Sequence, residues 1–180
     1  MSREKWFNPE DKSQCVIRPD LQDKTASHLP PNLLVIFSQN FLKNFITPNM
    51  LYQDSDLLQF FGGESILYKS DSNRNLVAIE GTISAPIGVS AIQTAVSRGV
   101  KRVFVLGLCG AVDSSLNVGD FILPTLCERE EGTSFHYIPP NAAASPNYEM
   151  LQSLTKHLEK HNLPYRAGKT VSTDAPYRQT

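Results

Sequence analysis

An apolar strand that runs directly into a glycine-lined turn is the feature that most constrains this chain. Residues 102–106 have the β-branched, aromatic and aliphatic content of a strand covered on both faces of a sheet. Gly107 and Gly110 follow, and glycine lets a backbone bend sharply and approach a ligand closely. Because open α/β sheets bind ligands at the carboxyl ends of their strands, this turn predicts a ligand site.

The residues before this turn complete a strand–helix–strand unit. Residues 76–80 have strand composition, Gly81 breaks the pattern, and apolar residues then recur at helical spacing from Val89 to Val96. Crossovers of this kind make the two flanking strands parallel and are almost always right-handed. The sequence therefore predicts the α/β class.

The same signals place the other elements. Strands are predicted at 33–37, 65–69, 120–123 and 167–172, and helices around Phe41–Phe45 and, after Ser145 and Pro146, around Leu151–Leu158. We expect an N-terminal arm over residues 1–28 and one domain over residues 29–180. This domain is expected to be a three-layer α/β/α structure with a twisted, mixed, largely parallel sheet. It would be incomplete at the C-terminus, because no helix follows the last strand.

Composition restricts the class of partner. The net charge of -1 gives no basic surface for nucleic acid, and no apolar run is long enough for a membrane helix or a signal peptide. We therefore expect a cytoplasmic protein with neither nucleic acid nor membrane as partner.

The three cysteines show no C-x-x-C spacing, so neither a disulfide framework nor a zinc site is predicted. Cys109 lies in the glycine turn. With no His or Asp beside it in the sequence, it is interpreted as a small packing residue rather than a nucleophile.

Polar loops follow several of the predicted strands. If the strands are parallel, the loops 81–86, 107–111 and 172–177 gather at one edge of the sheet, and residues 128–137 add charge, hydroxyl, imidazole and aromatic groups. This mixture suits a nucleoside-sized pocket. Other interpretations stay open: a structural His136, Asp174 as a loop cap, core positions for Phe135 and Tyr137, and a solvated strand edge for Glu128, Glu130 and Glu131.

The order of these motifs resembles the nucleoside phosphorylase superfamily, which includes uridine and purine nucleoside phosphorylases and related nucleosidases. The resemblance covers residues 80–180, and its most specific element is Val118-Gly-Asp120 after the glycine turn. The other matching motifs are Gly81-x-x-x-Ala-Pro86, Gly99-Val-Lys101, Gly107-x-Cys-Gly-Ala111, Arg129-x-x-Gly-Thr-Ser134, His136-Tyr137, and Gly168 leading to Ser172-Thr-Asp-Ala-Pro-Tyr177.

The resemblance implies a substrate site, no cofactor beyond inorganic phosphate as a possible co-substrate, and a homo-oligomer. The Gly81 loop and the 107–111 turn would border ribose and phosphate, the 136–137 pair would contact ribose and base, and the loop at 172–174 would lie beside the base. The substrate-binding residues it implies are Gly81, Gly107, Cys109, Gly110, His136, Tyr137, Thr173, Asp174 and Arg178. Asp174 is the one catalytic candidate.

The implied activity is cleavage of the N-glycosidic bond of a purine or pyrimidine nucleoside by phosphate, giving base and pentose 1-phosphate. The chain departs from many phosphorylases at Val105 and Leu108, where they carry arginine and threonine, and its residues 37–40 show no glycine-and-arginine phosphate loop. The family's glutamate-rich ribose motif and its acidic residue near the base lie in a C-terminal third with no counterpart here. A water-using nucleosidase and a non-catalytic nucleoside-binding or assembly protein are the alternatives.

Overall fold

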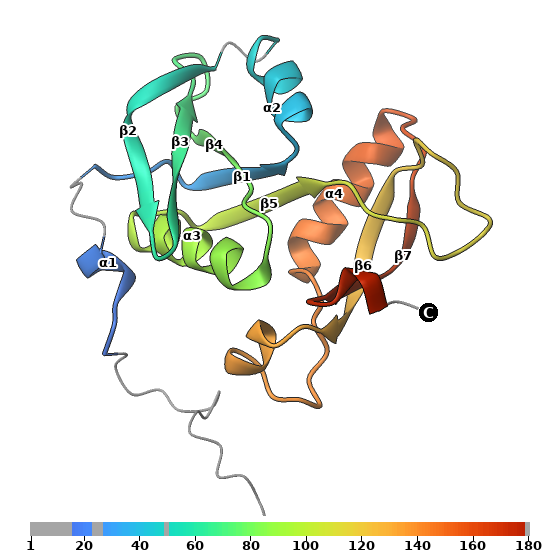
Figure 1. Cartoon of the computed structure of the whole chain (residues 1–180). Coiled ribbons are helices and arrows are strands. Elements are labelled where there is room, and N and C mark those ends of the chain that lie inside the picture. The colour runs from blue at the N-terminus through green and yellow to red at the C-terminus, as the bar shows by residue number, and fades with distance from the viewer. Residues whose placement is uncertain (1–15, 23–26, 49–50, 179–180) are drawn as a thin grey trace, which may run out of the picture. The chain divides into compact units, whose positions relative to one another are not determined.

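The computed structural model describes residues 16–22, 27–48 and 51–178 (Figure 1). They divide into two compact units, with the boundary between Cys109 and Gly110. Each unit has its own sheet. Most of the expected N-terminal arm, residues 1–15 and 23–26, lies outside the described residues.

The first unit contains a five-stranded mixed sheet in the order β2-β3-β4-β1-β5. The strands are β1 (Asn32–Phe37), β2 (Tyr52–Phe60), β3 (Gly63–Lys69), β4 (Leu76–Glu80) and β5 (Arg102–Gly107). Strands β4 and β5 flank β1 and both run parallel to it, whereas β2, β3 and β4 pair antiparallel. The mixed α/β sheet and the parallel strands of the crossover unit are confirmed.

Helices contribute to both faces of this sheet. Leu33 and Val35 of β1 share a buried cluster with Ala91 and Ala95 of α3 (Ala85–Ser97). Side chains alternate along a strand, so Ile36 points to the opposite face, where α2 (Gln39–Ile46) contacts β1 and buries its own Leu42. The short α1 (Pro19–Gln22), within the expected arm, contacts α3 and β2.

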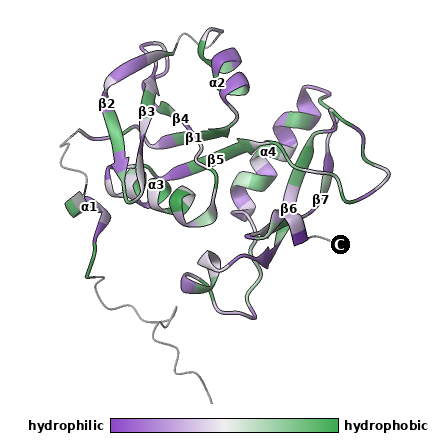
Figure 2. Cartoon of the chain, viewed as in Figure 1, coloured by the Kyte–Doolittle hydropathy of each residue, from purple (hydrophilic) through white to green (hydrophobic). Residues whose placement is uncertain are grey.

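Strand β5 differs from its prediction. It pairs with β1 alone in this sheet, and its Phe104 and Val105 are 38% and 59% exposed. Figure 2 shows the apolar character of this strand in green. The expected cover on both faces of the strand is therefore wrong for these two residues.

The second unit is built on the parallel strands β6 (Ile122–Glu130) and β7 (Arg166–Thr173), joined through α4 (Tyr148–Lys160). Two short 3-10 helices, η1 (Thr133–His136) and η2 (Pro176–Arg178), follow the strands. Strand β6 continues well beyond residue 123, past a register shift between Pro124 and Leu126. The cap of α4 is Asn147, whose Oδ1 accepts from the Met150 amide, rather than Ser145.

No helix in the described part of the chain has the length and apolar character needed to cross a membrane.

Candidate functional site

The carboxyl ends of three parallel strands meet in the first unit. Phe37 at the end of β1 is in register with Gly107 at the end of β5, and Ile36 is in register with Glu80 at the end of β4. The amide of Gly81 donates to the Ile36 carbonyl over 2.8 Å. The predicted gathering at one sheet edge is thus confirmed for the Gly81 and Gly107 loops, whereas the third loop, 172–177, ends a strand of the other sheet.

The ring of Phe37 explains why one of these residues is glycine. A Cβ placed on Gly81 would lie 2.6 Å from the Cγ of Phe37, and one on Gly107 would lie 3.3 Å from its Cβ. The first distance is far below van der Waals contact, so glycine at position 81 makes room for the ring itself. The resemblance assigns Gly81 to the ribose side of a ligand site, and its close approach to Phe37 was not predicted.

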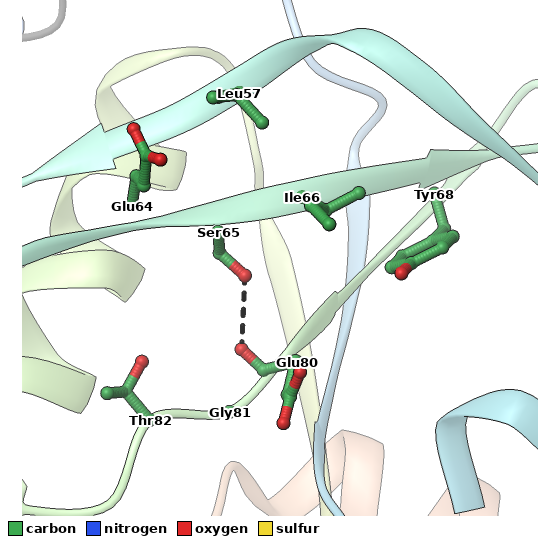
Figure 3. A pocket seen from close by; sticks show the side chains of 8 residues that line it. All are labelled: Leu57, Glu64, Ser65, Ile66, Tyr68, Glu80, Gly81 and Thr82. Atoms are coloured by element: carbon green, nitrogen blue, oxygen red, sulfur yellow. Dashed lines mark hydrogen bonds between the residues drawn. The ribbon is translucent and has the colours of Figure 1, made fainter. Parts of the chain in front are cut away.

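A pocket of about 380 Å³ opens beside the Gly81 loop. In Figure 3 its lining comes from the neighbouring strands β2, β3 and β4 and the residues after β4, namely Leu57, Glu64, Ser65, Ile66, Tyr68, Glu80, Gly81 and Thr82. The Ser65 hydroxyl donates to the Glu80 carbonyl over 3.2 Å. The volume is within the range of small-molecule sites, and the lining offers hydroxyl and carboxylate groups beside an aliphatic and aromatic wall. Of these residues, only Gly81 was predicted from the sequence as a binding residue.

The turn after β5 has a different character from its prediction. Cys109 is exposed, so its expected role as a packing residue is wrong. Leu108 is 74% exposed, and no cationic side chain occurs from Val105 to Ala111. Any anion bound at this turn must therefore be held by backbone N–H groups or by cations from elsewhere.

In the second unit, the loops after β6 and β7 lie side by side. Glu130 is in register with Thr173, and the Asp174 carboxylate accepts a hydrogen bond of 2.9 Å from the Gly132 amide. The Asp174 amide in turn donates to the Glu130 carbonyl over 3.4 Å. The predicted proximity of the 128–137 and 172–177 segments is confirmed, and Asp174 has the contacts of a loop cap.

Three residues predicted to contact the ribose or the base lie in, or directly after, the short helices η1 and η2. His136 is exposed at the end of η1, and Tyr137 follows, 47% exposed, with its amide donating to the Ser134 carbonyl over 3.0 Å. A core position for Tyr137 is therefore wrong. Arg178 is exposed in η2.

Glu131 is a correction to the expected solvated edge. It is only 7% exposed, and its Oε2 accepts from the Ser134 amide over 2.9 Å. Burial by itself raises the pKa of Glu131, but hydrogen bonds from Ser134 and the Thr133 amide, together with the charge of Arg129, outweigh burial and hold the pKa below its usual value. Glu128, by contrast, is exposed as predicted and lies 3.3 Å from the Lys169 ammonium.

The predicted site residues thus form two groups. Gly81, Gly107 and Cys109 belong to the first unit, and the remaining residues, namely Gly110, His136, Tyr137, Thr173, Asp174 and Arg178, belong to the second. Convergence of the two groups on one ligand stays a prediction.

The family profile described as the phosphorylase superfamily matches residues 63–180. This chain belongs to the phosphorylase superfamily. The match takes in β3 to β7, and with them every predicted site residue.

Comparison with individual members of the phosphorylase superfamily agrees with this assignment. The chain is 29% identical over 130 residues to a guanosine phosphorylase of Halorubrum lacusprofundi, covering 72% of this chain and 54% of that protein. It is 28% identical over 102 residues to a uridine phosphorylase of Haemophilus influenzae, covering 57% of this chain and 40% of that one. The chain therefore spans about half, or less, of the length of these curated relatives.

The fold is also found among solved structures. A purine nucleoside phosphorylase from Toxoplasma gondii, crystallised with immucillin-H, superposes with a TM-score of 0.72 at 17% identity. The superposition covers 84% of this chain and 60% of that one. At this identity the likeness concerns the α/β fold.

Proposed function

We propose that this chain serves the phosphorolysis of a purine or pyrimidine nucleoside, which gives a free base and a pentose 1-phosphate. The observation that carries the proposal is the meeting of the Gly81 and Gly107 turns at the ends of parallel strands, in a chain whose residues 63–180 match the phosphorylase superfamily. The relatives named guanosine and uridine phosphorylase support the reaction type and leave the base open.

In this reaction an oxygen of phosphate forms a bond to the anomeric carbon of the sugar. The C–N bond breaks, its electron pair leaves with the base, and a proton reaches the base nitrogen. Positive charge develops on the sugar and negative charge on the base, so the site must place an anion near ribose and a hydrogen-bond donor near the base. Preoriented groups do this without reorganisation during the reaction.

The proposed roles follow the two groups of residues. The Gly81 and 107–111 turns would receive ribose and phosphate, with backbone N–H groups facing the anion. Tyr137 would stack on the base, and His136 would contact the ribose. Thr173, Asp174 and Arg178 would line the base side, where Arg178 is a hydrogen-bond donor.

One feature favours hydrolysis as a second candidate. Val105 in β5 and Leu108 in the turn after it are exposed apolar residues where a phosphorylase would place groups that bind phosphate. The pocket beside the Gly81 loop is lined by two glutamates, Glu64 and Glu80. A carboxylate is the kind of base that activates water in a nucleosidase.

The test is release of free base from guanosine, uridine, adenosine and inosine by the purified chain, with and without inorganic phosphate. Phosphorolysis predicts phosphate-dependent release with an equal amount of ribose 1-phosphate. Phosphate-independent release with free ribose would establish the nucleosidase instead. Nucleoside binding without release would contradict both reactions and identify a binding protein.

A further inference from the structure

Arg129, near the end of β6, is half-buried, and all three nitrogens of its guanidinium donate hydrogen bonds. Its guanidinium donates to the Ser134 hydroxyl over 2.8 Å and to three backbone carbonyls over 2.8 to 3.0 Å. The three carbonyls belong to Ile138, Pro139 and Ala142. The guanidinium also lies over the Phe135 ring, with 4.1 Å between the guanidinium carbon and the ring centroid.

These partners lie on both sides of Tyr137 in the sequence. Ser134 and Phe135 precede it, and the three carbonyl groups follow it. One planar group therefore fixes the backbone where it enters and where it leaves the segment that presents His136 and Tyr137. A guanidinium is suited to this because its donors form a rigid fork and its face stacks on an aromatic ring.

Two further hydrogen bonds hold the same segment near its N-terminal end. The buried Glu131 carboxylate accepts from the Ser134 amide, and Asp174 accepts from the Gly132 amide. The loop is thus held by three side chains, although it lies at the surface and Tyr137 is 47% exposed. Such ordering reduces the entropy lost when an aromatic side chain is immobilised by a ligand.

We infer that Arg129 is a positioning residue for base recognition: it holds η1 and Tyr137 in the conformation that stacks on a flat heterocycle. This rests on the proposed function, since it assigns the base to the His136–Tyr137 segment. Arg129 itself contacts protein groups only, and its effect reaches the ligand through the loop.

The test compares R129A and R129K with the wild-type chain by equilibrium dialysis of radiolabelled guanosine and uridine. R129A is expected to weaken binding of the preferred nucleoside at least tenfold. R129K is expected to recover little of this, because an ammonium group provides neither the planar fork nor the stacking face. Where the wild type turns over, KM should rise while kcat changes less than threefold.

Amide hydrogen exchange provides a readout that does not depend on activity. In R129A, exchange should accelerate over residues 131–142, while protection in β1 and β4 remains as in the wild type. Arg74, exposed in the β3–β4 loop, supplies the matched control, and R74A should behave as the wild type.

Unchanged nucleoside affinity in R129A, full recovery in R129K, or absence of nucleoside binding to the wild type would each overturn the inference. Binding that depends on Arg129 without any cleavage would uphold it while contradicting the proposed reaction, so the two failures are distinguishable.

Discussion

The Phe37 ring occupies the space that a side chain at Gly81 would need, because a Cβ there would lie 2.6 Å from the ring carbon Cγ. Phe37 ends β1 and Gly81 directly follows the neighbouring parallel strand β4, and the Gly81 amide donates to the carbonyl of Ile36, the residue before Phe37. This contact fixes the geometry of the strand ends where we place the ribose.

Replacing Gly81 with alanine should therefore lower the free energy of unfolding by about 1–3 kcal/mol, the usual cost of overpacking. Urea denaturation measures the change. Gly88→Ala is the matched control, because its Cβ would lie 3.9 Å from the same ring and alanine favours the helix by up to about 1 kcal/mol. In a Phe37→Ala background the penalty of Gly81→Ala should largely disappear; a penalty that persists there would show that the ring is not its cause.

The ionisation of Asp56 makes the free energy of unfolding depend on pH. The Arg98 guanidinium, in a residue that is 6% exposed, donates to the Asp56 carboxylate and to the carbonyls of Ser27 and Leu57. Burial alone raises the pKa of Asp56, but hydrogen bonds from Ser27 and Arg98 outweigh it and leave the pKa below its usual value. The stabilisation is therefore complete above the unfolded-state pKa of about 3.9 and is lost as pH falls through the lower folded-state value.

Asp56→Asn should lower the free energy of unfolding at pH 7 by about 1–3 kcal/mol, since it leaves the buried guanidinium without its carboxylate. The difference from the wild type should begin to shrink below about pH 4, where the carboxyl of the unfolded state becomes protonated, and should continue to shrink through the lower folded-state pKa. Chemical denaturation from pH 2 to 7 measures both effects. Asp71→Asn, in the exposed β3–β4 loop, is the control, and a deficit of equal size at pH 2.5 and pH 7 would refute the assignment.

Two substitutions at Asp174 distinguish a loop-capping role from a role as catalytic acid. Asparagine retains a side-chain oxygen able to accept from the Gly132 amide, so D174N should keep kcat within about threefold, whereas D174A should weaken nucleoside binding. A general acid or base is instead worth about 10²–10⁴ in rate. Steady-state base release measures the difference, and a loss of that size in D174N would assign Asp174 to the chemistry.

The sequence predicted most strands and both long helices because their apolar residues repeat with the period of the element. It missed β2, whose Asp54 and Asp56 interrupt the pattern, since their ion pairs with Lys69 and Arg98 exist only after folding. Phe37 and the bonds of Arg129 were missed for the same reason: side-chain contacts between distant segments leave no local signal. The motifs did predict which loops adjoin within each unit, because parallel strands align their ends.

The central claim is that this chain binds a nucleoside whose base stacks on the exposed ring of Tyr137. Tyr137→Ala removes that ring, and equilibrium dialysis of a radiolabelled nucleoside against the wild type and the variant tests the claim most directly. We predict that the substitution weakens binding at least tenfold, or about 1.4 kcal/mol; wild-type affinity in Tyr137→Ala would contradict the claim.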